Sequence, residues 1–317
     1  MRQYIAPLLA HGVALQEYAL NTGAYPPAAR IARPVWGGRR LSELAWAIAS
    51  TRDADATLLQ REMISSFKSL EGFTKRPRIF DVDDAVHLQR GGLFARKIAA
   101  ACDRVIAGNA YLADYYSQWN SDVVVMPTGV DSDAYIPAER TESSANIIIG
   151  WIGTSANFVY LRQIEMALAQ FLDAVPGAHL RIISNTSPDF LHINPTRWTF
   201  IPWTEEREIS DIQSMDIGIM PLTDSDWARG KCSFKMLQYM ACGLPVIVSP
   251  VGMNADVLRQ GEIGVGAMTE SDWIDGLTML AHFPAQRKLL GENGRALIEQ
   301  RYAVKTLVPQ FVRHLQG

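Results

Sequence analysis

Basic side chains gather at the start of one segment, Arg229 to Pro250, whose pattern predicts a short helix followed by a strand. Arg229, Lys231 and Lys235 fall at or near the N-terminus of that helix. Free backbone N–H groups and the positive end of the helix dipole already favour an anion there, and three cations add full charges. We interpret the segment as a phosphate-binding site. The alternative is a surface helix whose lysines are solvated.

The helix is predicted from the spacing of its side chains. Its apolar residues recur at helical intervals and would pack on a core: Phe234, Leu237, Met240 and Ala241. Ser233 is predicted to cap the start of the helix, and Gly243 to end it. Gln238 continues the face that carries the two lysines, and its amide could bind a hydroxyl pair such as a ribose diol.

Carboxylates cluster where a predicted strand, 78–80, runs into Asp81, Asp83 and Asp84. Open α/β sheets bind their ligands at the carboxyl ends of parallel strands. We therefore expect Asp83 and Asp84 to bind the hydroxyls of a ligand or to orient a proton acceptor. The alternative, given equal weight, is a polar turn in which Asp84 caps the following segment. A divalent cation held by the Asp-x-Asp pair is the less favoured interpretation.

Four further candidate residues lie in three predicted turns. Gly153 and Thr154 follow a predicted strand and precede a helix, where a glycine lets the backbone approach a ligand closely. This turn matches neither GxGxxG nor a P-loop. Trp203 follows another predicted strand and could stack on a base or pack within its loop. Gly252 lies in the turn after the predicted strand 246–248.

The composition bounds the class of protein. A chain of 317 residues is long enough for two domains, and 48% hydrophobic with 20% charged residues is typical of globular proteins. A net charge of −3 argues against a general nucleic-acid binder. Three cysteines without a CxxC pair indicate a reducing compartment. No stretch approaches the roughly 20 apolar residues of a membrane span.

Predicted strands and helices alternate through both halves of the chain, which is typical of parallel sheets covered by helices. In the N-terminal half we predict strands over 13–18, 56–60, 78–80 and 122–126, and helices over 1–11, 40–50 and 93–102. In the C-terminal half we predict strands over 147–149, 180–184, 198–201, 215–220 and 246–248.

The Arg229 to Pro250 segment resembles the donor-binding motif of family 4 glycosyltransferases, the group 1 enzymes of the GT-B fold. Residues Gln238 to Val246 are similar to the family's Glu-Ala-Met-Ala-x-Gly-x-Pro-Val stretch, with Gln238 in place of the glutamate. The motif's other carboxylate falls on Gly230, so the neighbouring Lys231 would offer its charge to the diphosphate.

This resemblance implies an α/β protein of the GT-B class, with two Rossmann-like domains that face each other across a cleft. The expected parts are an acceptor-side domain 1–131 that lacks the family's first strand, a linker 132–146, a nucleotide-sugar-binding domain 147–301, and a helix 302–317 that returns to the N-terminal domain.

The implied activity is transfer of a sugar, with retention, from a nucleoside diphosphate sugar to a hydroxyl of a glycan, lipid-linked or small-molecule acceptor, in glycan or cell-envelope polysaccharide synthesis. The expected catalytic residues are Arg229, Lys231, Asp83 and Asp84. The expected donor-binding residues are Gly153, Thr154, Trp203, Arg229, Lys231, Ser233, Lys235, Gln238 and Gly252.

No cofactor, tightly bound metal or nucleic-acid partner is expected. The expected location is the cytoplasm, with room for a peripheral contact at the inner face of the membrane. One alternative is a non-catalytic GT-B relative that binds nucleotide sugar as a sensor or partner subunit. A second is a GT-B sugar-nucleotide epimerase. A Rossmann dehydrogenase is least favoured, because GxGxxG is absent.

Overall fold

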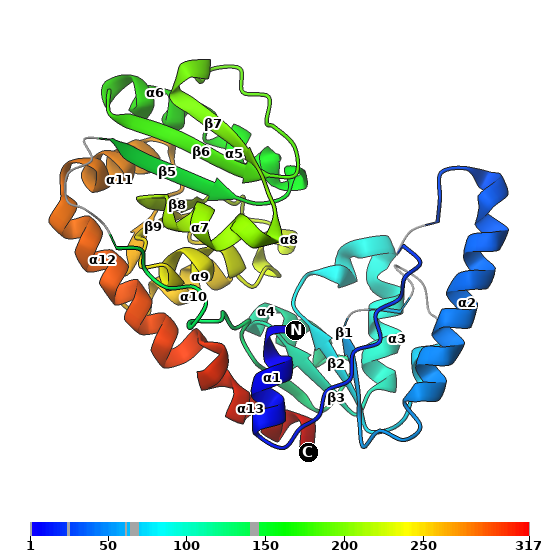
Figure 1. Ribbon diagram of the computed structural model, residues 1–317. Coiled ribbons are helices and arrows are strands. Elements are labelled where there is room, and N and C mark those ends of the chain that lie inside the picture. The colour runs from blue at the N-terminus through cyan, green and yellow to red at the C-terminus, as the bar shows by residue number, and fades with distance from the viewer. Residues whose placement is uncertain (1, 24–25, 61, 64–69, 140–145, 317) are drawn as a thin grey trace. The chain divides into compact units, whose positions relative to one another are not determined.

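The chain contains two compact units, each built on its own parallel sheet (Figure 1). The computed structural model describes residues 2–23, 26–60, 62–63, 70–139 and 146–316. The first unit comprises Met1–Pro127, Gly230–Cys232 and Val308–Gly317, and the second comprises Thr128–Arg229 and Ser233–Leu307.

The sheet of the first unit has four parallel strands in the order β1-β2-β3-β4. These are β1 (Thr57–Gln60), β2 (Arg78–Val82), β3 (Arg104–Ala107) and β4 (Val123–Val125). The predicted strand at 13–18 is wrong. Its side chains alternate between half-buried and exposed only over 13–16, and residues 13–18 lie outside every strand that the structure describes, because no strand pairs with them.

Helices of the first unit pack around this sheet. They are η1 (Arg2–Tyr4), α1 (Ile5–Ala10), η2 (Arg30–Ala32), α2 (Arg33–Ser50), η3 (Glu71–Phe73), η4 (Val86–Gly92), α3 (Leu93–Ala101), α4 (Ala110–Tyr116) and, from Val308 onward, α13 (Val304–Gln316). The start of α4 is capped by Asn109, whose side-chain oxygen accepts a hydrogen bond from the Leu112 N–H at 2.9 Å. The Tyr4 ring meets Phe311 of α13 edge-on.

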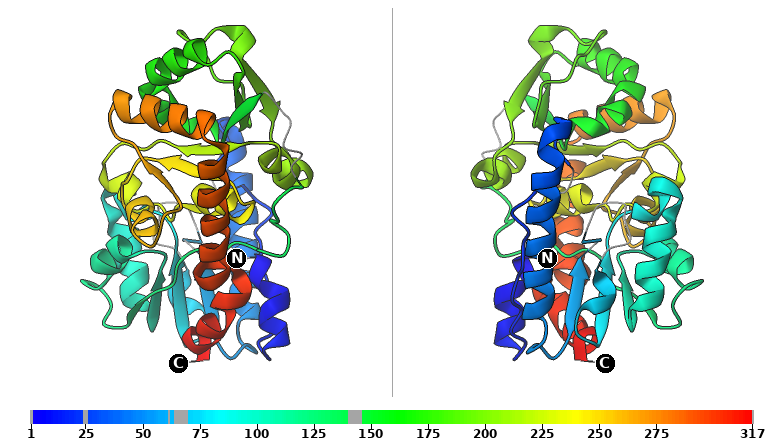
Figure 2. Two further views of the ribbon diagram at one scale, coloured as in Figure 1. Left: turned by 90° about the vertical axis from the view of Figure 1, so that its left-hand side faces the viewer. Right: turned by 90° about the vertical axis from the view of Figure 1, so that its right-hand side faces the viewer.

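Helix α2 begins earlier than predicted and depends on tertiary contacts (Figure 1, Figure 2). Gly37 and Gly38 lie in its interior, where each glycine costs about 1 kcal/mol relative to alanine. Leu44 is fully buried on its inner side. The Arg40 guanidinium donates to the Thr22 and Met63 carbonyl oxygens, each at 2.6 Å. These contacts offset the weak helix propensity of the glycine pair.

The sheet of the second unit has six parallel strands in the order β10-β9-β8-β5-β6-β7. They are β5 (Ile147–Ile152), β6 (Ala178–Ser184), β7 (Trp198–Pro202), β8 (Ile217–Met220), β9 (Val246–Val248) and β10 (Gly264–Gly266). All five strands predicted for this half are confirmed, and β10 was not predicted. Because every strand is parallel, all six carboxyl ends meet at one edge of the sheet.

The core of this unit lies between the sheet and its helices. Ile149, Ile182 and Ile217 are at most 1% exposed, and Trp273 packs with them. The helices are η5 (Ser155–Asn157), α5 (Phe158–Gln163), α6 (Glu165–Ala174), η6 (Pro195–Arg197), η7 (Glu205–Arg207), α7 (Glu208–Gln213), α8 (Asp226–Arg229), α9 (Phe234–Ala241), α10 (Met253–Leu258), α11 (Glu270–His282), α12 (Pro284–Leu297) and the π-helical turn η8 (Ile298–Tyr302).

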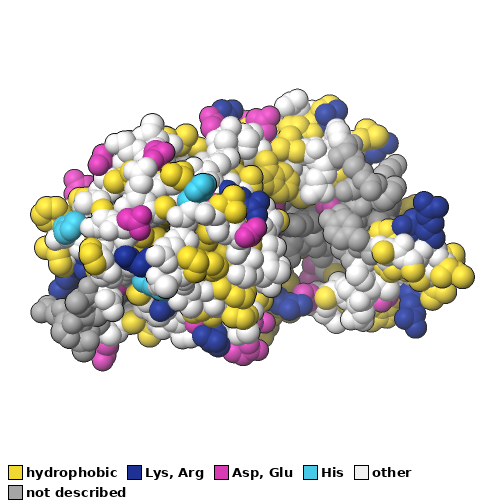
Figure 3. All heavy atoms as spheres, turned by 90° about the horizontal axis from the view of Figure 1, so that it is seen from above, with side chains coloured by type: hydrophobic (Ala, Val, Ile, Leu, Met, Phe, Trp, Pro, Cys, Tyr) yellow, Lys and Arg dark blue, Asp and Glu magenta, His cyan; other side chains and the backbone are white. Residues whose placement is uncertain are grey.

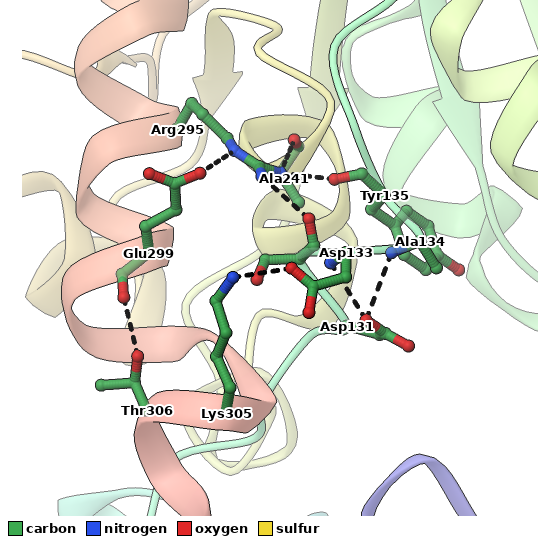
Figure 4. Close-up of polar contacts among 10 residues, drawn as sticks. Asp131, Asp133, Ala134, Tyr135, Ala241, Arg295, Glu299, Lys305 and Thr306 are labelled. Carbon is green, nitrogen blue, oxygen red and sulfur yellow. Dashed lines mark hydrogen bonds and ion pairs between the residues drawn. The ribbon is translucent and has the colours of Figure 1, made fainter. Parts of the chain in front are cut away.

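Residues 131–135 overlap the start of the predicted linker, 132–146, and are held against α12 and the first turn of α13 in the second unit (Figure 4). Arg295 donates to the carbonyl oxygens of Ser132, at 2.8 Å, and of Ala241, at 2.7 Å. Lys305 pairs with Asp133 at 2.6 Å. The start of the predicted linker is therefore an ordered part of this unit, and 140–145 lie outside the described residues.

Gly218 of β8 allows the Tyr239 ring of α9 to lie directly on the sheet. A Cβ at this position would be 2.4 Å from the Tyr239 Cγ atom. We expect Gly218→Ala to destabilise the protein by about 1–3 kcal/mol, because the buried ring must move to make room. Urea unfolding would measure the change. Gly261→Ala is the matched control, since its Cβ would come no closer than 3.8 Å to a neighbouring atom. An equal effect of both substitutions would contradict this explanation.

The surface mixes charge and apolar groups. The face shown in Figure 3 carries Lys, Arg, Asp and Glu side chains interspersed with hydrophobic ones. Within the described residues, no helix has the length and apolar character needed to cross a membrane.

Candidate functional site

The carboxyl edge of the second unit's sheet brings together turns from separate parts of the chain. Gly153 follows β5, Asn185 follows β6, Trp203 follows β7 and Gly252 follows β9. Ligands of open α/β sheets bind at this edge. The structure therefore places four of the loops relevant to the predicted site at the edge where a ligand would bind.

Lys235, on the first turn of α9, lies over the Gly153 turn. A Cβ at Gly153 would be 2.7 Å from Lys235 Cε and equally close to the Trp151 ring. The close packing explains the glycine, because any side chain would displace the lysine stem. Lys235 and Gly153 were predicted from segments about eighty positions apart, and the structure brings them together. The lysine places a positive charge beside the turn.

The Gly153 turn is fixed by Asn185, a residue that the sequence analysis missed. The Asn185 side-chain oxygen accepts from the Ser155 N–H at 2.8 Å, and its amide donates to the Ser155 hydroxyl at 3.1 Å. The Thr154 hydroxyl accepts from Asn157 at 3.0 Å. The only signal for Asn185 was its place directly after a predicted strand, and no motif marked it.

Arg229 and Gly252 are also brought together. Gly252 has a φ of +53°, and a Cβ there would lie 2.8 Å from the Arg229 Cα, so two independent reasons require glycine. The Arg229 guanidinium forms a bidentate pair with Asp224, at 2.7 and 2.9 Å. This pairing holds the pKa of Asp224 below its ordinary value. A phosphate would share Arg229 with this carboxylate, which the sequence analysis did not identify.

Two details predicted for α9 are wrong. Ser233 has a left-handed backbone with φ +54°, and its side chain makes no capping hydrogen bond. A capping serine normally has an extended backbone, which this turn does not have. Phe234, predicted to face the core, is 37% exposed. The other predicted core residues, Leu237, Met240 and Ala241, are buried as predicted, and Met236 is buried with them.

Gln238 and Trp203 are joined through Glu208 of α7. The Gln238 amide is buried and donates to Glu208 Oε1 at 2.7 Å and to the Tyr135 hydroxyl at 2.9 Å. The Tyr135 hydroxyl also bonds to Glu208. The Trp203 indole N–H donates to Glu208 Oε2 at 2.6 Å, while 45% of the residue remains exposed. Burial and the bond to Glu208 raise the pKa of Tyr135.

These hydrogen bonds determine how Gln238 and Trp203 could contact a ligand. The amide of Gln238 already has two partners, so it would have to exchange one of them to bind a ribose diol. Trp203 presents an accessible ring whose orientation is fixed at its nitrogen. Glu208 was missed because it lies thirty residues before Gln238, within a stretch that carries no motif.

We expect Glu208→Gln to destabilise the protein by about 1–3 kcal/mol, because a carboxamide keeps one acceptor oxygen and turns an N–H₂ toward a buried donor. It should also lower affinity for any ligand that stacks on Trp203. Thermal unfolding and nucleotide titration would measure the two effects. Glu206→Gln, an exposed neighbour, is the control. Unchanged stability in Glu208→Gln would show that the three hydrogen bonds contribute little.

In the first unit, Asp83 and Asp84 follow β2 at the carboxyl edge of its sheet. Asp84 accepts a hydrogen bond from the adjacent Ala85 N–H at 2.9 Å. Burial lowers the pKa of Lys231, and the negative charge of Asp84 acts in the opposite direction. The predicted residues Asp84 and Lys231 are therefore electrostatic neighbours within this unit.

Gly230 packs too tightly for any side chain. Its Cβ would lie 2.5 Å from the Ala85 Cβ and 3.1 Å from the Ala85 Cα. A glutamate at this position would need both backbones to move. This packing accounts for the glycine where the resembled motif has a carboxylate.

A metal site is not evident among the residues that the structure describes, since none of their His, Cys, Asp and Glu side chains form a group of three or more suited to an ion. The site chemistry in the second unit is that of cations and hydrogen-bond donors. That the reaction needs no tightly bound metal stays a prediction.

Comparison with known proteins gives consistent matches. Residues 147–281 match the family model described as "Glycosyl transferases group 1". The chain is 24% identical over 228 residues to D-inositol 3-phosphate glycosyltransferase from Actinosynnema mirum, covering 62% of this chain and 53% of that protein. The same enzyme from Rhodococcus erythropolis is 26% identical over 235 residues, covering 62% and 52%. The chain thus spans about half the length of these curated relatives.

Solved structures match nearly the whole chain. Sucrose-phosphate synthase from Thermosynechococcus elongatus superposes with a TM-score of 0.71 at 15% identity, covering 99% of this chain and 91% of that one. HepE from Anabaena, in complex with UDP and glucose, gives 0.68 at 13% identity, covering 98% and 88%. These matches confirm the expected GT-B fold class.

Proposed function

We propose that the protein transfers a sugar from a nucleoside diphosphate sugar to an acceptor hydroxyl, with retention, and the match of residues 147–281 to the group 1 glycosyltransferase model supports this. The match confirms the family resemblance inferred from the Arg229 to Pro250 segment. One observation carries the proposal for this chain: Lys235 lies over the Gly153 turn at the carboxyl edge of a parallel sheet.

The donor would bind along that edge. Its diphosphate would contact Lys235, Arg229 and the Gly153 turn, and its base would stack on the exposed Trp203 ring. Negative charge grows on the diphosphate as the glycosidic bond breaks. Cations already placed beside it stabilise the transition state more than the ground state, which is how they accelerate the reaction.

The remaining roles complete this proposal. Asp83 and Asp84 would contact the acceptor, which is a glycan, lipid-linked or small-molecule hydroxyl in glycan or cell-envelope polysaccharide synthesis. Lys231 would add charge to the diphosphate. No cofactor takes part, and the proposed location is the cytoplasm. The UDP bound in the HepE structure makes UDP and UDP-sugars the first donors to test.

One observation favours a second candidate, a non-catalytic relative that binds nucleotide sugar. Both motif carboxylates are absent: Gly230 has no room for a side chain, and the Gln238 amide is already bonded. Such a protein would bind the nucleotide but neither transfer nor hydrolyse the sugar. Turnover of a bound UDP-sugar would exclude it.

The first experiment is a thermal-shift series with nucleoside diphosphates and their sugars, with and without EDTA. A ligand that binds only the folded state raises the melting temperature. We expect a rise with one nucleotide, unchanged by EDTA. No rise with any nucleotide would refute donor binding, and a rise abolished by EDTA would refute the metal-independent mechanism.

Lys231 makes nucleotide binding sensitive to pH. Its cationic form binds phosphate, and burial lowers its pKa. Affinity should therefore be present below that lowered pKa and lost as the pH rises through it, below the range where a solvated lysine titrates. Lys231→Ala should weaken UDP binding by roughly 1.5–3 kcal/mol and remove this part of the pH dependence.

Isothermal titration across neutral to alkaline pH would measure both effects. Lys231→Arg is the informative companion, because a guanidinium keeps its charge over the whole range and should restore affinity without the alkaline loss. Wild-type affinity in Lys231→Ala would remove this lysine from the donor site.

A further inference from the structure

Helices η2 and α2 of the first unit expose one continuous row of side chains. Ile31, Val35, Arg39 and Trp46 are separated by four, four and seven residues, which places them on one face of a helix. Ile31 is 91% exposed, Val35 64% and Trp46 62%. Together with Leu41, 56% exposed, these residues are named the α2 outer face. Large apolar side chains rarely gather on a surface without a partner.

The α2 outer face is not the side of the helix that packs on the core. The opposite side of the helix supplies the packing: Leu44 is fully buried, Ala47 is 7% exposed, and Arg40 is anchored to the Thr22 and Met63 carbonyls. Trp46 rests by its edge on Tyr18, at 5.1 Å between ring centroids, which steadies the indole while leaving most of it accessible.

Basic charge is concentrated in the N-terminal part of this face. Residues 26–42 contain four arginines, Arg30, Arg33, Arg39 and Arg40, and no acidic residue, although the whole chain carries −3. Arg30, Arg33 and Arg39 are exposed. The next acidic residue, Glu43, is half-buried and accepts a hydrogen bond from the Thr22 hydroxyl at 2.6 Å. A partner for this face must therefore be anionic at its surface and apolar beneath.

We propose that the α2 outer face docks on an anionic lipid surface. A helix that carries exposed aliphatic residues and a tryptophan beside arginines matches a bilayer interface. Ile31, Val35 and Trp46 enter the boundary between headgroups and acyl chains. Arg30 and Arg39 pair with lipid phosphates. This inference is independent of the proposed donor chemistry, and it assigns the expected peripheral membrane contact to a particular surface.

The test is co-sedimentation of the full chain with vesicles of phosphatidylcholine alone and of phosphatidylcholine mixed with phosphatidylglycerol. We expect binding to the anionic vesicles only, and weakening by salt. The double substitution Arg30→Gln with Arg39→Gln should weaken binding about fivefold for each arginine removed. The double substitution Ile31→Ser with Val35→Ser should weaken it roughly tenfold or more.

Two matched controls keep the result specific. Leu191→Ser removes an equally exposed aliphatic side chain of the second unit, and Arg313→Gln an exposed arginine of the first. Both should bind as wild type does, and all variants should keep the wild-type melting temperature because the substituted side chains are exposed.

Several outcomes would overturn the proposal. Absence of binding to phosphatidylglycerol vesicles would do so, as would equal binding to phosphatidylcholine alone. Wild-type binding by the Ile31→Ser, Val35→Ser variant would place the lipid contact elsewhere. Size-exclusion chromatography would reveal the competing occupant: a dimer without lipid that this variant dissociates would assign the face to a second copy of the chain.

Discussion

Replacing Lys235 by methionine is expected to lower kcat/KM for sugar transfer by roughly 10²–10³-fold, equal to about 3–4 kcal/mol of transition-state stabilisation. Methionine keeps much of the lysine stem, which lies over Gly153, and removes the charge. The loss should fall mainly on kcat, because the diphosphate gains negative charge only as the sugar departs.

The measurement is steady-state kinetics with the donor found by thermal shift. Lys288→Met, on the exposed side of α12, is the matched control and should leave kinetics unchanged. Gly153→Ala tests the same lysine without removing its charge. The added Cβ would come within 2.7 Å of Lys235 Cε and would displace the lysine side chain. If Lys235→Met retained wild-type kcat while Gly153→Ala lost it, the turn and not the lysine would support the reaction.

Trp203, on which a base would stack, is held in place by a hydrogen bond to a carboxylate and not by a cation. Glu208 joins Trp203 to Gln238 and Tyr135, so one carboxylate connects the loop after β7, helix α9 and the 131–135 segment. A shift in any one of these elements would alter the others. The ring on which a base would stack is thus coupled to the helix that carries Lys235.

The central strands of the second unit's sheet were predictable because most of their residues are buried, as in β8 and β9, where every residue is. Runs such as 147–149 and 246–248 are continuous and apolar, as buried parallel strands must be, and they became β5 and β9. The segment 13–18 has the alternation of a strand but lacks a neighbour. Its hydrogen bonds depend on tertiary pairing, which side-chain spacing alone does not report.

Only some residues of the candidate site could be predicted from the sequence, because the others take their roles from tertiary contacts. Basic residues at a helix start and glycines in turns after strands can be recognised from the sequence, which is how Lys235, Arg229, Gly153 and Gly252 were selected. The structure brings these four residues together in two pairs. Asn185, Glu208 and Asp224 carry no such signal, because their roles come from partners on other elements or from a loop fold. Ser233 was misjudged because its left-handed backbone is imposed by the turn that precedes α9.

The first unit yields the second large prediction. Asp84→Asn should reduce sugar transfer by roughly 10²-fold or more while leaving nucleotide binding intact, if this carboxylate orients or accepts a proton from the acceptor. Asparagine has nearly the same shape, and its side-chain oxygen can still accept the hydrogen bond from the Ala85 N–H, so the local turn is preserved. Only the charge and basicity are lost.

Transfer, donor hydrolysis without acceptor and UDP affinity should be measured on the same preparation, with Asp53→Asn, an exposed carboxylate of the first unit, as control. Loss of transfer with UDP affinity kept would place Asp84 on the acceptor side. A joint fall in melting temperature, binding and transfer would instead favour the capping role. Full transfer by Asp84→Asn would reject a catalytic carboxylate here, and Asp83→Asn would then be the variant to examine, because it follows the same strand at the same edge of the sheet.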